Sequence, residues 1–284
     1  MTHAAPLNAA LSTEPFRAPG HGNNARIGLA LIHGFTGNPA SLRPLAEGLA
    51  ARGFAIDLPR LPGHGTHVRD MARTTYPDYR AEVVATIDRL TPATDHVVLV
   101  GLSMGATLAL DVAATGDRST AVAGVVAINP QILDREGLAV KLAPLIERVL
   151  PLAPATLAGL HKDDIAKPGV SELAYDWVPT RAGNSLLREL PRIRARLPEI
   201  TCPVLVAHSR VDHSVPPENS QTVLELVKGG LATELVLERS FHVATLDYDR
   251  ELLEQRIAEF AERVSAQKTA ATAAPDAPGI RSES

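Results

Sequence analysis

The sequence predicts an α/β fold, in which a mostly parallel sheet is flanked by helices on both faces. Short apolar runs alternate along the chain with longer segments whose apolar residues recur at helical spacing. The runs are apolar at almost every position, which is typical of parallel strands buried on both faces. With 284 residues, of which 45% are hydrophobic and 21% charged, the chain is long enough to form a large core.

The expected elements follow from local patterns. Apolar, β-rich runs predict strands at residues 27–32, 54–58, 96–100, 122–128, 204–207 and 234–237. Helical spacing predicts helices at residues 38–53, 79–90, 104–114, 219–227 and 253–264. Asn38 suits the N-cap of the first helix, with Pro39 at its first position and Gly53 at its end. Apolar residues line one face of the last helix: Leu253, Ile257, Phe260 and Val264.

One long insertion divides the expected core. Residues 130–198 show mostly helical pattern, many prolines and no convincing strand, and a structureless loop of that length is rare, so we expect a helical cap. The α/β core then comprises residues 25–129 and 199–267. Residues 1–24 are rich in Ala, Pro, Gly and Asn and are expected to form an N-terminal arm. Residues 268–284 have almost no large apolar side chains, which predicts a disordered tail.

Composition excludes several classes of function. The net charge is −4 and no basic stripe stands out, which argues against nucleic acid as a partner. The single cysteine, Cys202, rules out an intrachain disulfide and a cysteine-based zinc site. No His, Asp and Glu cluster has metal-ligand spacing, so neither a metal nor a cofactor is expected. No apolar run approaches the ~20 residues that span a bilayer, and no signal peptide stands out. We therefore expect a cytoplasmic protein with at most transient membrane-surface contact; the oligomeric state stays open.

The motif Gly101-Leu102-Ser103-Met104-Gly105 predicts a nucleophile. It follows the run HVVLV and precedes the helical segment ATLALDVAA, and strand, G-x-S-x-G and helix together are the context of a nucleophile elbow. A bare G-x-S-x-G arises by chance in roughly one chain in ten of this length, and the flanking elements make chance a poor explanation. We expect Ser103 in a tight turn at the carboxyl edge of the sheet.

A serine hydroxyl needs a base, and the base needs an acid that orients it. Of the ten histidines, His242 stands between the last expected strand and the last expected helix, at the same sheet edge as Ser103. Asp212 follows the strand at 204–207 and is placed to accept the Nδ1–H bond of His242. Asp247 and Asp249 are alternatives, but they follow His242 at the start of a helix.

Acyl transfer also needs backbone N–H groups that stabilise a developing oxyanion. One donor is expected from Met104, the residue after the nucleophile. The second is expected from Phe35, in the loop His33-Gly34-Phe35-Thr36-Gly37 after the first strand. The glycines of this loop let its backbone approach a substrate closely.

The stretches HGFTG, LPGHG at 61–65, GLSMG, SRVDHSVPP and SFHVATLDYD together resemble the α/β-hydrolase superfamily. Within it they resemble bacterial carboxylesterases and monoacylglycerol lipases with a short N-terminus and a helical cap. The resemblance covers about residues 14–266. It implies the α/β-hydrolase fold, with the triad Ser103, Asp212 and His242 and the oxyanion donors Phe35 and Met104. The strands that usually open the superfamily's sheet are missing, so we expect a small sheet.

The resemblance further implies a serine ester hydrolase acting on small to medium acyl esters, with monoacylglycerol as the leading substrate. The stretch IAKPGVSELAYDWVP in the insertion resembles the monoacylglycerol lipase cap. In that family a cap carboxylate helps to recognise the glycerol head group, yet no acidic residue stands between Arg148 and His161. The cap is expected to act as a lid, and four of its apolar residues are expected to line an acyl pocket: Leu142, Leu145, Ile146 and Val149. The alternative is that these residues pack the cap onto the body.

Two other functions fit the same residues. An amidase, thioesterase or lactonase would use the same triad. A receptor or scaffold with a hydrolase fold would not need the triad at all, although no member of the triad is missing here.

Overall fold

The computed structural model describes residues 11–134, 147, 149–157 and 161–273. Within them, seven strands form one sheet in the order β1-β3-β2-β4-β5-β8-β9. The strands are β1 (Phe16–Ala18), β2 (Ile27–Ile32), β3 (Ala55–Leu58), β4 (His96–Leu102), β5 (Val122–Ile128), β8 (Val204–Ser209) and β9 (Ala232–Leu237). All neighbouring pairs are parallel except β1 and β3, so the predicted α/β fold with a mostly parallel sheet is confirmed.

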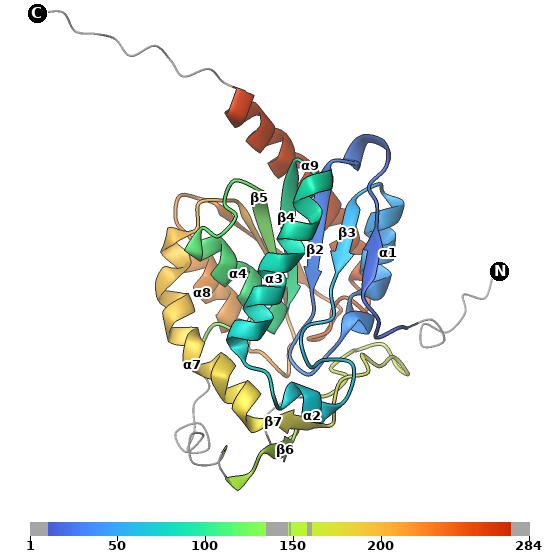
Figure 1. Cartoon of the computed structure of the whole chain (residues 1–284), viewed down its shortest axis with the longest axis vertical. Helices are drawn as coiled ribbons and strands as arrows, with labels where there is room; N and C mark the ends of the chain where they lie inside the picture. Colours follow the sequence, from blue (N-terminus) through green and yellow to red (C-terminus); the bar gives the residue numbers. More distant parts are fainter. Residues whose placement is uncertain (1–10, 135–146, 148, 158–160, 274–284) are drawn as a thin grey trace, which may run out of the picture.

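Helices cover both faces of the sheet (Figure 1). One face packs against α3 (Tyr76–Leu90), α4 (Met104–Thr115), α7 (Thr180–Arg196) and α8 (Glu218–Leu226). The other face packs against α1 (Arg43–Ala51) and α9 (Arg250–Ala273). The short elements are η2 (Gly22–Asn24), η3 (Pro39–Ser41), α2 (Val68–Met71), η4 (Thr91–Ala93) and η5 (Leu197–Glu199). Strands β4 and β5 are buried at every position, which explains why their sequences are continuously apolar.

Two helices begin elsewhere than the periodicity predicts. The segment expected as one helix from residue 38 splits into η3 and α1, because Pro44 enters the first turn of α1 and brings no backbone N–H. Asn38 still caps η3, since its side chain accepts from the N–H of Ala40. Helix α3 begins at Tyr76, three residues earlier than expected, because Thr75 and Asp78 form a capping box.

Both ends of the described chain are more ordered than composition predicts. Within the expected arm, β1 adds an antiparallel edge strand, and Arg17 of β1 lies 3.3 Å from Asp57 of β3. At the other end, α9 continues to Ala273, which corrects the tail boundary at residue 268. The Lys268 ammonium donates to two carbonyls, those of Ser119 and Val122, and an alanine-rich segment favours helix once it is anchored. The part of the tail from residue 274 onward lies outside the described residues.

The insertion holds an unexpected two-stranded sheet. Strand β6 (Leu152–Pro154) pairs antiparallel with β7 (Trp177–Pro179). Each strand has only three residues and carries prolines, which an edge tolerates and which hide the alternation that would reveal a longer strand. In Figure 1, β6, β7 and α2 lie at the bottom of the view, opposite the exposed end of α9.

Helix α7 is tied to the body by a buried carboxylate. Asp111 of α4 is fully buried and accepts hydrogen bonds from Arg192 of α7, Arg80 of α3 and Tyr76 of α3, each at 3.0 Å. Leu190 and Ile193 of α7 are also fully buried in the same layer. The C-terminal part of the insertion therefore packs as part of the α/β body. No helix in the described ranges is long and apolar enough to cross a membrane.

Candidate active site

Ser103 stands between β4 and α4 in a strained backbone conformation, with φ 55° and ψ −118°. A non-glycine residue rarely adopts this conformation, and such strain concentrates at functional sites. Two neighbouring glycines make the turn possible. A Cβ at Gly105 would lie 2.1 Å from the carbonyl oxygen of Ile32, and one at Gly101 would lie 2.3 Å from the carbonyl oxygen of Gly105. The predicted elbow is therefore present, and it holds Ser103 at the carboxyl end of β4.

His242 and Asp212 meet in the structure. Nδ1–H of His242 donates to Oδ2 of Asp212 at 2.7 Å, and the other oxygen of Asp212 accepts from the backbone N–H groups of Ser214 and Val215. This hydrogen bond fixes the tautomer and leaves Nε2 of His242 unprotonated. The two alternative acids serve elsewhere: Asp247 accepts from the N–H of Phe241, and Asp249 from the N–H of Arg239.

Charge around His242 favours the imidazolium. Burial alone would lower its pKa, but the charge and hydrogen bond of Asp212 outweigh burial, and Glu172 and Asp164 add to the effect. The pKa of His242 is therefore raised above its ordinary value. A raised pKa strengthens the imidazole as a base and stabilises the cation that forms when it takes a proton.

The loop after β2 lies directly beside Ser103. A Cβ at Gly34 would come within 3.4 Å of the Cβ of Ser103, so only glycine leaves the loop at its present distance without crowding. Met104 is the first residue of α4, where a backbone N–H has no partner within the helix. The loop and the start of α4 thus flank Ser103, as the candidate oxyanion donors Phe35 and Met104 require.

Two buried histidines hold this loop against its neighbour. Nε2 of His33 accepts from the N–H of Leu61 at 3.1 Å, while its Nδ1–H donates to the carbonyl of Gly34. His64 packs edge-on against His33, with ring centroids 5.1 Å apart. Burial lowers the pKa of His33 to about 3 and that of His64 to about 4, so both rings are neutral at physiological pH. The motifs HGFTG and LPGHG therefore meet through uncharged imidazoles.

This pair predicts a loss of stability in acid. Because the pKa values of His33 and His64 are lower in the folded state, the unfolded chain binds more protons below pH 6.5. The free energy of unfolding should fall as pH drops from about 6.5 towards about 4, by on the order of 5 kcal/mol from these two groups. Urea unfolding at intervals between pH 7 and pH 4 measures this loss. His64→Gln should reduce the pH-dependent part by about half; an unchanged pH dependence in that variant would exclude His64 as its source.

Glu172 is the site residue that the search between Arg148 and His161 missed. It lies in the stretch ELAY of the insertion, and its carboxylate faces the loop after β2, because a Cβ at Gly37 would lie 3.6 Å from Glu172 Oε2. Burial raises its pKa to about 7, although the nearby His242 opposes this shift. Among the described residues, no side chain or backbone group hydrogen-bonds its carboxyl group. A cap carboxylate is thus present near His242, and the resemblance of IAKPGVSELAYDWVP to a lipase cap was the available signal.

The predicted acyl pocket lies mostly outside the described residues. Leu142, Leu145 and Ile146 belong to the part that the structure leaves undescribed. Val149 is described, and it is 76% exposed rather than enclosed, because it follows immediately on the undescribed segment and precedes β6 at the surface. The acyl-pocket assignment therefore stays a prediction for the first three residues and has no support at Val149.

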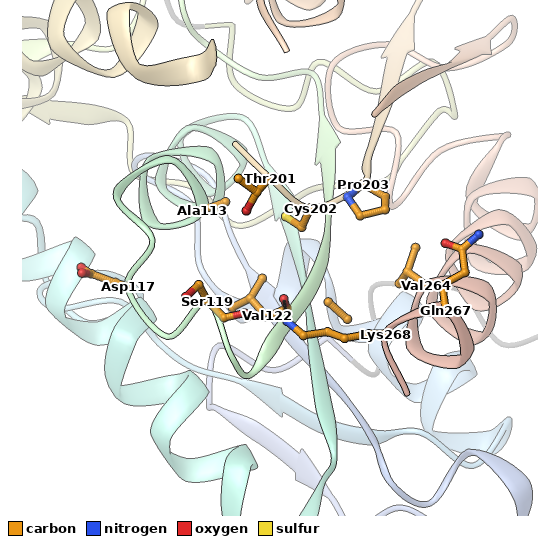
Figure 2. Close-up of a pocket in the computed structure, with 11 residues that line it drawn as sticks. Ala113, Asp117, Ser119, Val122, Thr201, Cys202, Pro203, Val264, Gln267 and Lys268 are labelled. Atoms are coloured by element: carbon orange, nitrogen blue, oxygen red, sulfur yellow. Dashed lines mark hydrogen bonds between the residues drawn. The ribbon is translucent and has the colours of Figure 1, made fainter. Parts of the chain in front are cut away.

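A cavity of about 290 Å³ lies at the opposite end of the sheet. Figure 2 shows Cys202 and Pro203, which precede β8, facing Val122 at the start of β5 and Lys268 of α9. These are the amino ends of the strands, whereas Ser103 follows the carboxyl end of β4. The cavity is therefore separate from the candidate site. In the described ranges, no group of three or more His, Cys, Asp or Glu residues is arranged to hold a metal ion.

Known proteins share this arrangement over most of the chain. The model of the alpha/beta hydrolase family matches residues 29–260. A thermostable monoacylglycerol lipase of Bacillus sp. (strain H-257) is 38% identical over 247 residues, which cover 87% of this chain and 93% of the relative. A carboxylesterase of Bacillus subtilis (strain 168) is 25% identical over 82% of this chain and 92% of its own length.

Solved structures agree with these relatives. A structure from the work on the metagenome-derived lipolytic enzymes LipS and LipT superposes with a TM-score of 0.80 at 35% identity, covering 88% of this chain and 98% of that one. The monoacylglycerol lipase of Paleococcus ferrophilus has the same fold, with a TM-score of 0.73 at 23% identity over 89% of this chain and 99% of that one. The chain therefore belongs to the alpha/beta hydrolase family, within its group of bacterial carboxylesterases and monoacylglycerol lipases.

Proposed function

We propose that this protein is a serine hydrolase of carboxylic esters and that monoacylglycerols are its main substrates. The observation that carries the proposal is the strained Ser103 turn, set against the loop of Gly34, at the sheet edge where His242 and Asp212 are hydrogen-bonded. The relatives named as a monoacylglycerol lipase and a carboxylesterase support the reaction class.

The proposed reaction passes through an acyl-enzyme. Nε2 of His242 takes the proton from Ser103 Oγ as that oxygen attacks the ester carbonyl carbon, and Asp212 stabilises the imidazolium. The N–H groups of Phe35 and Met104 stabilise the oxyanion. Collapse of the tetrahedral intermediate breaks the bond to the alcohol, which leaves with the proton from His242. Water, deprotonated by the same imidazole, then attacks the acyl carbon and releases the acid and Ser103.

The position of Glu172 supports glycerol as the alcohol. A monoacylglycerol presents two free hydroxyl groups beside the scissile ester, and each needs an acceptor once it leaves water. Glu172 offers carboxylate oxygens that accept no hydrogen bond from the described residues, near His242, from which the alcohol receives its proton. A p-nitrophenyl ester has no hydroxyl group to use this acceptor.

Glu172→Gln tests the substrate assignment. At pH 8, above the pKa of about 7, Glu172 is mostly ionised, so the variant replaces a charged acceptor by a neutral amide. We expect kcat/KM for 1-monoacylglycerols to fall by roughly 10- to 100-fold, the cost of one hydrogen bond to a charged group. Turnover of p-nitrophenyl butyrate should change by less than about threefold.

A matched control for this variant is Glu199→Gln. Glu199 pairs with Arg196 at the exposed end of the insertion, so both activities should be retained. An equal loss on both substrates in Glu172→Gln would mean that Glu172 supports the site without binding glycerol. A profile over monoacylglycerols, triacylglycerols, p-nitrophenyl esters, amides and thioesters would identify an amidase or thioesterase, should one of those be the true activity.

We also propose that the insertion 130–198 covers the site as a cap, between core segments 25–129 and 199–267. Tyr175 supports this role, because its N–H donates to the carbonyl of Thr36 and its hydroxyl donates to the carbonyl of Gly63. Through these bonds the cap touches the loops that carry HGFTG and LPGHG.

A further inference from the structure

One segment of the insertion contacts the loops of the proposed acid, base and oxyanion donor. We call residues 163–175 the strap. Its Asp164 is buried and accepts from both the backbone N–H and the ring Nδ1–H of His213, at 3.0 and 2.7 Å. The carbonyl of the same residue accepts from the N–H of Val243 at 3.0 Å. His213 directly follows Asp212, and Val243 directly follows His242, so a single residue joins the two loops.

Further bonds fix the position of the strap. The N–H groups of Ala166 and Lys167 donate to the carboxylate of Asp247, which also accepts from the N–H of Phe241, the residue before His242. On the oxyanion side, the side-chain amide of Asn38 donates to the carbonyl of Leu173 at 2.8 Å. The strap is thereby held on both sides of the site, so the place of Asp164 is set independently of the pair that it joins.

We propose that Asp164 is a positioning residue, which sets the relative placement of Asp212 and His242 by binding the backbone next to each of them. The inference rests on the proposed function. The geometry suits the task because bonds to backbone groups fix loops more firmly than bonds to side-chain ends. The catalytic geometry is steep: a displacement of about 1 Å costs on the order of 100-fold in rate.

Asp164 also acts on His242 through its charge. The ionisable groups that bear on His242 are Asp212, Glu172 and Asp164, and all three favour its protonated form. The groups that face Asp164 itself are His213 and the strap residues Asp163 and Glu172. The ring of His213 packs edge-on against Phe241 at 4.7 Å, and His161 lies beyond it at 6.3 Å. Removal of the Asp164 anion should therefore let His242 lose its proton at a lower pH.

Two substitutions separate position from charge. Asp164→Asn removes the anion and one acceptor oxygen, and we expect kcat to fall about 10- to 100-fold with KM within about twofold. The acid limb of the kcat/KM profile against pH should move down by about half a unit. Asp164→Glu keeps the anion but changes the reach of the side chain, so kcat should fall while the acid limb stays in place. Both are measured with p-nitrophenyl butyrate between pH 5 and pH 9.

Control variants give this experiment its sharpness. His213→Gln removes the ring bond but keeps the backbone bond to Asp164, so kcat should change by less than about threefold. Asp111→Asn alters a fully buried carboxylate in the α3–α4–α7 layer, and it should lower the melting temperature without moving the acid limb. A shift of the acid limb in Asp111→Asn would mean that loss of stability alone explains the Asp164 variants.

The outcome for Ser103 separates this inference from the proposed function. If Ser103→Ala retained turnover, the proposed function would fail. If Ser103→Ala is inactive while Asp164→Asn keeps both kcat and the acid limb of the native protein, only the positioning role is overturned. Should Asp164→Asn not fold, Asp164→Glu still decides the matter: native kcat in that variant refutes the positioning role, and reduced kcat with an unmoved acid limb supports it.

Discussion

Ser103→Ala should lower kcat for ester hydrolysis by at least about 10⁴-fold, because no other group in the proposed site can form the acyl-enzyme. The fold should be retained, since the strained turn depends on Gly101 and Gly105 rather than on the serine hydroxyl. His242→Ala should cost a similar factor, and the double variant little more than either alone, because the two residues act as a unit. Steady-state rates with p-nitrophenyl butyrate, at matched circular dichroism spectra, measure these losses.

A fluorophosphonate probe gives a second readout of the same prediction. It should label Ser103 and no other serine in the native protein, and it should label nothing in Ser103→Ala. Ser209 and Ser240 are the nearest rivals along the chain, but both are buried and donate their hydroxyl protons to Phe241 and Asp249. A peptide map with the label on either of them would overturn the assignment of the nucleophile.

Gly105→Ala should be the most damaging single-methyl change near the site. The new Cβ would lie 2.1 Å from the carbonyl oxygen of Ile32, well inside contact distance, and the obstacle is the backbone of β2. The start of α4 or the end of β2 must move. We expect a loss of at least about 3 kcal/mol in the free energy of unfolding, with a large loss of activity because Ser103 moves with α4. Urea unfolding and kcat are the measurements.

Gly183→Ala is the matched control, since Gly183 is also a helical glycine of the same chain. A Cβ there would lie 3.6 Å from the ring of Phe35, an ordinary contact, and alanine favours helix by up to about 1 kcal/mol. Stability should be unchanged or slightly higher. Equal effects in the two variants would show that the steric reason given for the elbow glycines is wrong.

The parallel core and the order of its elements were predictable because each depends on local pattern. Apolar runs such as residues 122–128 carry their own signature, and a tight turn at Ser103 needs glycines that the sequence displays at Gly101 and Gly105. The pairing of His242 with Asp212 followed from topology, since both stand after strands that end at the same edge.

The misses are places where distant contacts decide the outcome. Strand β1 has only three residues and exists because β3 offers an open edge. The last turns of α9 exist because Lys268 finds carbonyl partners near β5. Glu172 is separated from every proposed catalytic residue by forty or more positions, and only the path of the strap brings it to His242. No periodicity within such a segment records where it will be held.

The buried carboxylate of Asp111 has a consequence for how the molecule opens. Because Asp111 binds arginines on both α3 and α7, moving α7 outward would leave a charge without partners in the interior, at a cost of about 3 kcal/mol or more. Helix α7 therefore belongs to the rigid frame, and substrate entry depends on the chain that precedes it. Amide protons in the middle of α7 should then exchange with solvent only through global unfolding, at the same rate as those of the buried strand β4.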